Sequence, residues 1–238
     1  MDRRAFLAVA GSLLASACTP GGGFQPLAGL LEPTTSEPHR VAPVNLATIP
    51  QQYRRQIVSD PTGESPGTIV VDPEQRHLYL VMENGRAMRY GIGVGREGFG
   101  WSGAATIKRK AKWPTWTPPK EMQARDPEAR KFANGMPGGS TNPLGARALY
   151  LYQGNRDTLY RIHGTFEPQS IGRAVSSGCI RLLNADIIDL YDRVPIGTRV
   201  VVRPVSSNFM ARFTQPSAAP DADSDWRASV KRLMARAG

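Results

Sequence analysis

Cysteine is scarce in this sequence: only Cys18 and Cys179 occur among 238 residues. Two cysteines so far apart do not form the closely spaced Cys/His set of a zinc site, and no Cys-x-x-Cys motif is present for redox exchange. We therefore expect neither a metal nor an organic cofactor. Aromatic residues are also few, at 8%, whereas 24 glycines and 20 prolines indicate many turns. This composition favours a mainly β fold with one or two short helices over a helical bundle.

The chain lacks the patterns of nucleic-acid-binding proteins even though it is strongly basic. Its formal net charge is +10 and its pI is about 10.1. Such a charge favours polyanions in general, including nucleic acid, acidic lipid and an anionic cell wall. The basic residues are scattered, however, and neither a helix-turn-helix pattern nor an RNA-binding signature is present. We therefore expect no nucleic-acid partner.

A long apolar run is absent, and the nearest approach to one is at the N-terminus. Residues 1–18 combine a basic start, a short apolar stretch and small residues at the end, which is the form of an export signal. Arg3 and Arg4 resemble a twin-arginine signature, so both this route and the general secretory route stay open. The end resembles a lipoprotein cleavage box in which Cys18 would carry lipid, although Ala15 stands where Leu is usual. Ordinary cleavage is the alternative. We expect a periplasmic or cell-envelope protein, and favour an anchor at Cys18.

Composition divides the rest of the chain into three parts. Residues 19–66 are rich in Gly, Pro, Ser and Thr and are expected to form a tether between membrane and wall. Within them, Ile49–Val58 is a candidate short helix or edge strand. Residues 67–204 are expected to form the folded, catalytic domain. Residues 205–238 are expected to be a polar tail with a short C-terminal helix, because apolar residues recur there at helical spacing.

Turn signals separate short β-prone segments in the folded domain, and Asn84-Gly85 predicts a hairpin. Gly135–Gly145 is expected to be a long irregular connection of the kind that often carries function. Asn184 is a candidate N-cap for a helix that follows it. The expected strands are 68–72, 77–82, 86–94, 106–113, 148–152, 159–162 and 198–203, and residues 126–132 are a further expected helix.

The residues around Cys179 carry the chemistry. Cysteine attacks as a thiolate, and an imidazole within reach, here that of His163, takes its proton and returns it to a leaving group. Small residues before the thiol let backbone N–H groups approach a carbonyl oxygen, so Ser177, Gly178 and Cys179 are candidate oxyanion donors. Arg181 is a permanent cation that can hold a carboxylate. This stretch predicts acyl transfer from an anionic donor, rather than the buried, inert state of many lone cysteines.

The motif His-Gly-Thr at 163–165, Ser-Ile-Gly at 170–172 and Ser-Ser-Gly-Cys-Ile-Arg at 176–181 resembles the L,D-transpeptidase catalytic domain, also called the YkuD domain. The resemblance implies a β-sandwich or barrel whose cysteine remodels the peptide stems of peptidoglycan. It also implies roles for single residues. Cys179 matches the nucleophile, His163 matches the general base and acid, Gly178 and its neighbouring amides match the oxyanion hole, and Arg181, Ser176 and Thr165 are expected to contact substrate.

The chain departs from many members of that family at three positions. It has Ser177 where they have His, Arg181 where they have Asn, and Gly164 where they have Ser. These departures point to the Ser-Gly-Cys-Ile-Arg branch and argue against a role for a second histidine. Because Gly164 has no side chain to orient the imidazole, a backbone carbonyl is expected to do so.

Trp113 and Trp116 stand among prolines, and two interpretations stay open for them. They form either a rigid aromatic wall for a sugar or peptide substrate, with Trp116 as a binding residue, or a cover for the core.

Residue chemistry alone extends to thiol-dependent acyl transfer. The resemblance adds the substrate: a peptidoglycan stem as donor, with an amine of another stem or of a wall-anchored lipoprotein as acceptor. Water as the acceptor would give an L,D-carboxypeptidase or endopeptidase on the same residues. A non-catalytic wall-binding lipoprotein is the remaining alternative, since it would use the basic surface and the tether but no activated thiol.

Overall fold

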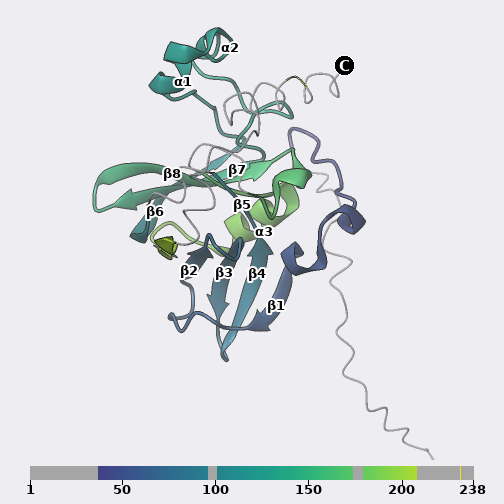
Figure 1. The fold of residues 1–238 in the computed structure, drawn as a ribbon, viewed down its shortest axis with the longest axis vertical. Coiled ribbons are helices and arrows are strands. Elements are labelled where there is room, and N and C mark those ends of the chain that lie inside the picture. Colours follow the sequence, from purple (N-terminus) through teal and green to yellow (C-terminus); the bar gives the residue numbers. More distant parts are fainter. Residues whose placement is uncertain (1–36, 96–100, 174–178, 208–230, 232–238) are drawn as a thin grey trace, which may run out of the picture.

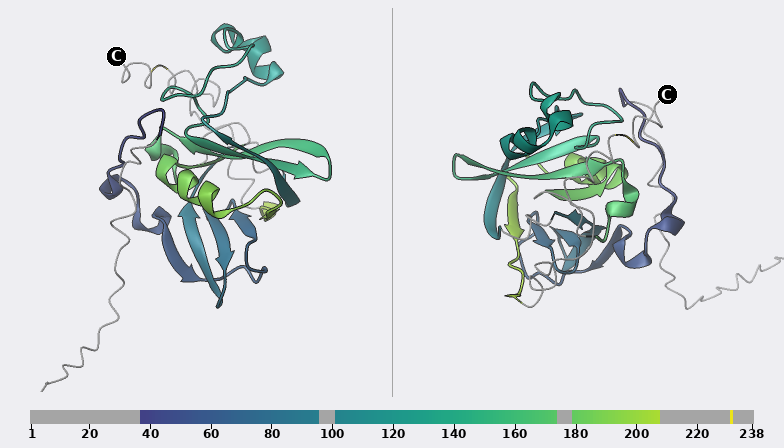
Figure 2. Two further views of the ribbon diagram at one scale, coloured as in Figure 1. Left: turned by 180° about the vertical axis from the view of Figure 1, so that it is seen from behind. Right: turned by 45° about the horizontal axis from the view of Figure 1, so that its top comes forward.

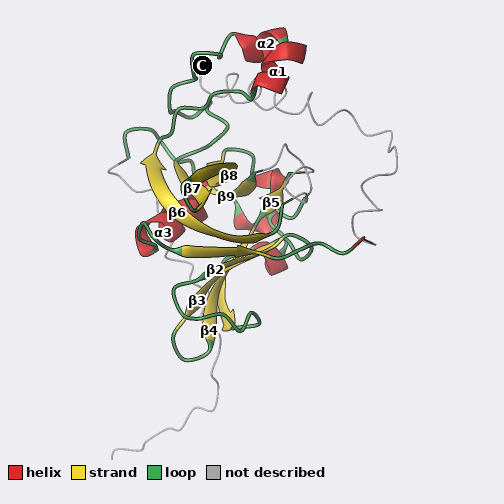
Figure 3. Cartoon of the chain, turned by 90° about the vertical axis from the view of Figure 1, so that its left-hand side faces the viewer, coloured by secondary structure: helices red, strands yellow, loops and turns green. Residues whose placement is uncertain are grey.

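The fold is mainly β, as expected, in a computed structural model that describes residues 37–95, 101–173, 179–207 and 231. Its strands form one ten-stranded sheet, accompanied by three short α-helices (Figures 1 and 3). The strands are β1 (Gln56–Ser59), β2 (Ile69–Asp72), β3 (His77–Met82), β4 (Arg86–Gly91), β5 (Gly93–Val94), β6 (Gly103–Lys112), β7 (Arg147–Gln153), β8 (Arg156–Thr165), β9 (Ile180–Leu183) and β10 (Arg199–Val202). The helices are α1 (Lys120–Arg125), α2 (Pro127–Arg130) and α3 (Asn184–Arg193), with 3-10 turns η2 (Leu46–Thr48), η3 (Gln51–Tyr53) and η5 (Pro168–Ser170).

The strand order shows how the sheet encloses the core. It runs β1-β4-β3-β2-β10-β6-β7-β8-β9-β5. The half that holds β1 to β4 lies across from the half that holds β6 to β8, and α3 lies between them (Figures 1 and 2). The main core takes buried side chains from both halves and from α3, among them Ile69, Leu78, Ile107, Leu149, Ile162, Leu182 and Ile187. Alternate residues of the central strands therefore face inward, and the others remain free to build a site on the outer face.

The meander predicted from local signals is present, with one break. Strands β2, β3 and β4 pair in sequence as antiparallel neighbours, and Asn84 and Gly85 both have positive φ, as a hairpin turn of this kind requires. The expected strand at 86–94 is instead divided at Ile92. Its last part, β5, leaves β4 and pairs with β9 at the far end of the sheet. Residues 86–94, which the sequence predicts to be one strand, therefore link the two ends of the sheet.

The expected tether at 19–66 needs correction for its described part. Strand β1 pairs antiparallel with β4 and forms the edge of the sheet, which confirms the edge-strand option for this region. Upstream of it, Ile49 is 1% exposed and packs with Val44 and Tyr53 against Ile171 and Leu183 of the folded domain. Since these contacts bury apolar surface, residues 37–59 belong to the packed unit, which begins before Gly67. Residues 1–36, with the expected export signal and Cys18, lie outside the described part.

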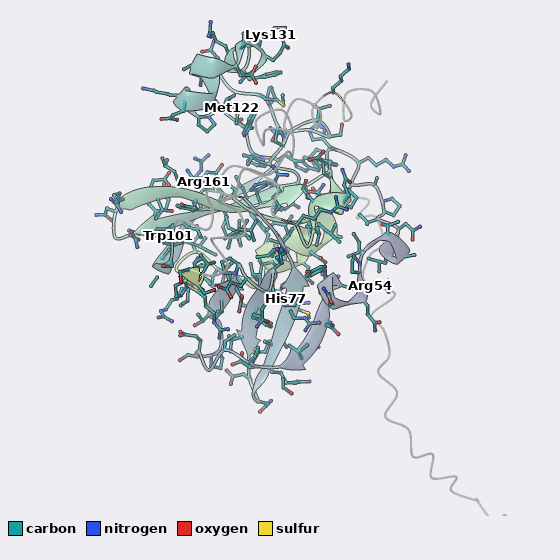
Figure 4. All side chains as sticks on the ribbon, viewed as in Figure 1. Arg54, His77, Trp101, Met122, Lys131 and Arg161 are labelled. Atoms are coloured by element: carbon teal, nitrogen blue, oxygen red, sulfur yellow. The ribbon has the colours of Figure 1, made fainter. Side chains whose placement is uncertain are left out.

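Between β6 and β7 the chain makes a long excursion that carries α1 and α2, where Met122 and Lys131 are labelled in Figure 4. The expected helix at 126–132 is present in shorter form as α2, and Asp126 caps its N-terminus by accepting a hydrogen bond from the Glu128 N–H at 2.9 Å. The irregular connection at 135–145 closes around Asn142, which is fully buried. The Asn142 side-chain amide donates to the carbonyls of Pro114, Met136 and Pro137, each at 3.0 Å.

The closing strand lies in the middle of the sheet. Strand β10 pairs in parallel with β2 and antiparallel with β6, and so joins the two halves. The expected C-terminal helix falls almost entirely on residues 208–230 and 232–238, which lie outside the described part. Among the described residues, no helix is long and apolar enough to cross a membrane.

Substitution of Asn142 by Ala should destabilise the domain by about 2–4 kcal/mol, because it leaves buried carbonyls without a donor. Urea unfolding followed by intrinsic fluorescence would measure the change. Asn155→Ala is the matched control, since exposed Asn155 only accepts a hydrogen bond from Lys108; its effect should stay within about 0.5 kcal/mol. Equal effects of the two substitutions would show that Asn142 does not organise the excursion.

Candidate active site

His163 lies near the end of β8 and is 3% exposed. Its Nδ1 is 2.7 Å from the carbonyl oxygen of Gly164. A carbonyl only accepts, so Nδ1 carries a proton and donates it to this oxygen. This contact agrees with the expectation that a backbone carbonyl orients the imidazole.

The surroundings of His163 favour its neutral form. Burial is the largest cause that lowers the pKa of His163 from its ordinary 6.5 to about 3, and the positive charge of Arg181 is the second. Hydrogen bonds to the carbonyls of Gly164 and Leu144 oppose these effects without cancelling them. A neutral imidazole at physiological pH is the form that accepts a proton from a thiol.

Cys179 directly precedes β9, the strand that pairs with the strand of His163. The two strands run parallel, with Ile162 opposite Ile180 and His163 opposite Arg181. Ile162 and Ile180 both point into the main core. Since side chains alternate along a strand, Cys179, Arg181 and His163 share the opposite face. Cys179 is partly exposed, as a nucleophile that meets a substrate must be.

Gly164 and Gly145 are tightly packed around one side chain of α3. A Cβ on either glycine would overlap Oδ1 of Asn184. The same oxygen accepts a hydrogen bond from the Ala146 N–H at 2.9 Å, and Asn184 is 4% exposed. Asn184 therefore fixes the backbone on both sides of the imidazole, since Ala146 leads into β7 and Gly164 supplies the orienting carbonyl.

That role corrects the prediction for Asn184. The helix begins at Asn184 itself, Leu183 occupies the N-cap position, and no side chain caps it. Asn184 is turned toward β7 and β8 instead, where its oxygen satisfies a buried N–H. The signal available in the sequence was a polar residue directly after the apolar pair Leu182-Leu183.

Arg181 is largely buried and faces an acid that the sequence analysis did not single out. Its guanidinium Nη1 lies 3.7 Å from Oε2 of Glu167, and their side chains are 14% and 8% exposed. The expected partner of Arg181 was a substrate carboxylate. The structure shows that Glu167 already neutralises part of this positive charge.

The remaining predicted binding residues fall into three groups. Thr165 is buried, and its hydroxyl accepts a hydrogen bond from the Glu167 N–H at 3.0 Å, which turns the chain after β8. Trp116 packs in the excursion with Phe132, Met122 and other apolar residues, which favours its structural interpretation. Ser176, Ser177 and Gly178 lie outside the described residues.

Trp113 lies at the base of the excursion and is fixed from several sides. Its ring stacks on Phe166 at a centroid distance of 6.2 Å and meets the edge of His39 at 4.7 Å. Its Nε1 donates to Glu37 at 2.7 Å, and Glu37 also forms an ion pair with Arg147, which is 2% exposed. Trp113 is thus tied to the N-terminal segment.

Within the described ranges, no group of His, Cys, Asp and Glu side chains is arranged to hold a metal ion.

Comparison with known proteins agrees with this architecture. The family model of the L,D-transpeptidase catalytic domain, YkuD, matches residues 66–202. This match spans more than half of the chain, and the chain belongs to that family.

Relatives of known sequence support the assignment. The chain is 37% identical over 160 residues to the probable L,D-transpeptidase ErfK/SrfK of Escherichia coli K12, with 65% of this chain and 48% of that protein covered. It is also 37% identical over 157 residues to the probable L,D-transpeptidase YbiS of the same strain, with coverages of 64% and 47%. The chain thus spans about half the length of the curated relatives it matches.

A crystal structure described as a probable carnitine operon oxidoreductase CaiA from Brucella melitensis is 54% identical to the chain. The match covers 67% of this chain and 99% of that one, with a TM-score of 0.47. At that TM-score the likeness carries no argument about the function of this chain.

The buried, neutral imidazole predicts a specific pH dependence of stability. In the unfolded chain His163 titrates near its ordinary 6.5, whereas in the folded chain its pKa is about 3. Between these values the unfolded chain binds more protons, so the folded state loses stability as the pH falls. The difference in unfolding free energy between the parent protein and His163→Gln should shrink by about 1.4 kcal/mol from about pH 7.5 to about pH 5.5.

Urea unfolding of both proteins at the two pH values would measure this change. The other titrating groups contribute equally to the unfolding free energies of both proteins, so their contributions cancel in the difference. No further control variant is therefore needed. A difference that does not change with pH would show that His163 is protonated equally in the folded and unfolded states.

Proposed function

We propose that this chain is an L,D-transpeptidase that remodels peptidoglycan through a cysteine thioester. The observation that supports the proposal is the parallel pairing of β8 and β9. His163, which is neutral and oriented by a backbone carbonyl, lies in β8, and Cys179 directly precedes β9. Its relatives ErfK/SrfK and YbiS are probable L,D-transpeptidases, which supports this reaction class.

The reaction begins when Nε2 of His163 takes the proton from Sγ of Cys179. The thiolate attacks the carbonyl of the L-centred third residue of a tetrapeptide stem and forms a tetrahedral oxyanion. Backbone N–H groups at Gly178 and Cys179 stabilise this oxyanion by about 3 kcal/mol for each donor. The intermediate expels the terminal D-amino acid, whose amine takes the proton from His163, and a thioester remains.

The second half of the reaction repeats these steps with a new nucleophile. An amine of another stem attacks the thioester, His163 takes its proton, and the thiolate of Cys179 leaves and is reprotonated. The acceptor is a stem amine or a lysine of a wall-anchored lipoprotein. If water is the acceptor, the same residues perform L,D-carboxypeptidase or endopeptidase chemistry.

Envelope location fits this substrate. We propose that residues 1–18 direct export, that Cys18 carries a lipid anchor, and that residues 19–36 form a tether before the packed unit, which includes residues 37–59. The chain up to residue 204 then forms the catalytic domain, and residues 205–238 form the tail. The net charge of +10 favours an anionic wall as the surface on which the enzyme works.

Loss of the thiol should abolish turnover without unfolding the domain. Purified residues 19–238 incubated with tetrapeptide muropeptides should yield cross-linked dimers that lack one terminal D-residue, detected by mass spectrometry. Cys179→Ala should yield none, and His163→Ala should reduce the rate by about 10²–10⁴-fold because the proton acceptor is lost.

The products separate the competing functions. Dimers with the parent protein and none with Cys179→Ala establish transpeptidation. Tripeptides alone would establish hydrolysis as the reaction. Unchanged substrate with the parent protein would point to the wall-binding function, and normal activity of Cys179→Ala would refute the mechanism.

The pair formed by Arg181 and Glu167 predicts opposite effects of two substitutions that each remove one charge. If Arg181 binds a carboxylate of the donor stem, Arg181→Gln should raise the KM for the donor by about tenfold or more, since a charge-assisted hydrogen bond is lost. Glu167→Gln should lower that KM, because it removes the competing negative charge 3.7 Å away. Steady-state kinetics with a tetrapeptide donor would measure both. A fall in kcat alone for Arg181→Gln would assign Arg181 to the electrostatics of His163 instead.

A further inference from the structure

The N-terminal strap, defined as residues 37–55, contacts several elements that frame the active site. At its start, Glu37 binds Trp113 and Arg147, the two ends of the excursion. At its end, Arg55 forms ion pairs with Asp186 at 3.5 Å and Asp189 at 3.0 Å on α3. Figure 4 labels Arg54 of the strap and His77 of β3, and the strap is held to that strand by a contact of 3.0 Å between the His77 ring and the Gln52 carbonyl.

Between these ends, Tyr53 fills a position that two glycines leave open. A Cβ on Gly172 would overlap the Tyr53 ring, and a Cβ on Gly91 would overlap the Tyr53 backbone. Gly172 also has a φ of +80°, a conformation that glycine adopts without strain. Tyr53 therefore presses directly on the chain segment that approaches the cysteine, at residues 166–173, and on the end of β4.

Backbone hydrogen bonds connect these two glycines to the nucleophile. The Gly172 N–H donates to the Ile92 carbonyl at 3.0 Å, and the Val94 N–H donates to the Arg173 carbonyl at 3.1 Å. One residue further, the Gly95 N–H donates to the carbonyl of Cys179 itself at 3.3 Å. The run from Gly91 to Gly95 thus holds the approach segment and Cys179 together, and Tyr53 lies against its first residue.

Apolar contacts of the strap reinforce the same place. Ile49, Val44 and Tyr53 form one cluster with Ile171 of the approach segment and Leu183 at the end of β9. Cys179 lies between Ile171 and Leu183 in the sequence, so the strap packs on the chain before and after it. A loose approach segment would leave Cys179 free to move relative to His163, which belongs to a different strand.

We propose that the strap is a positioning clamp for the nucleophile, with Tyr53 as its central positioning residue. It acts by fixing Gly91 and Gly172, and through them the backbone at Cys179. The inference rests on the proposed cysteine acyl transfer. Because it concerns geometry and not substrate contact, the clamp should govern the rate of acylation and leave donor binding nearly unchanged.

The test compares Tyr53→Ala with two controls in purified residues 19–238. Tyr53→Phe keeps the ring, and the Tyr53 hydroxyl makes no hydrogen bond to a described residue, so this variant should behave like the parent. Val58→Ala removes apolar contacts of the neighbouring strand β1 on the face of the sheet away from the main core, with Val70, Tyr79, Val81 and Ala87. This variant measures how far a loss of stability that does not involve the clamp lowers kcat. All assays are run well below each variant's Tm.

We expect Tyr53→Ala to lower kcat for acylation by about 10–100-fold with little change in KM, as a misplacement of the nucleophile by about 1 Å would. Val58→Ala should lower Tm but leave kcat near that of the parent. The clamp would be refuted if Tyr53→Ala retained the parent kcat. It would also be refuted if Val58→Ala lost as much kcat for each degree of lost Tm as Tyr53→Ala does.

A measurement without any stem substrate keeps this proposal separate from the proposed function. The rate of Cys179 alkylation by iodoacetamide, followed from about pH 4 to about pH 10, gives the apparent pKa of the thiol. Tyr53→Ala should change this pH–rate profile, because the thiol would move relative to His163 and Arg181, whereas Tyr53→Phe and Val58→Ala should reproduce the parent profile. An inactive parent protein with this change in Tyr53→Ala would refute the proposed function and retain the clamp; an active parent without the change would do the reverse.

Discussion

The site depends on the parallel pairing of β8 with β9. Antiparallel neighbours can be joined by a short turn, but parallel ones need a connection that travels back along the sheet. Here that connection delivers Cys179 to the start of β9, on the face that carries His163. A long connection has many conformations, so its last residue is only as well placed as the contacts that hold it. The geometry of the pair is therefore decided largely outside the two strands.

Asn184 shows how closely the catalytic side is packed. Its Oδ1 occupies the space that a Cβ on Gly145 or Gly164 would need, and it also accepts the Ala146 N–H. The carbonyl of Gly164 is held where it meets Nδ1 of His163. No acidic side chain is needed to orient the ring, because a fixed carbonyl accepts the Nδ1 proton.

Local signals predicted much of the fold. The strands of the meander and the Asn84-Gly85 turn depend on short stretches of sequence, and the proposal that His163 acts on the thiol of Cys179 rests on one such stretch as well. The contacts missed are those between distant segments: Glu37 with Arg147, Arg55 with α3, and Asn184 with β7. A charged or polar residue in a Pro-rich stretch carries no periodicity, and its partner is defined only after the chain has folded. For this reason the sequence predicts a tether where the structure shows the strap.

Two buried groups near the site have opposite effects on stability. Burial raises the pKa of Asp186 from 3.8 to about 7 despite the nearby Arg55, so the folded chain binds more protons there than the unfolded chain does. Stability from this carboxyl falls as the pH rises through that range. The lowered pKa of His163 has the opposite sign, with stability rising as the pH rises from about 3 to 6.5. Because the two ranges overlap, their slopes offset each other below neutral pH. The stability that buried His163 loses in mild acid is therefore opposed by the stability that Asp186 gains there.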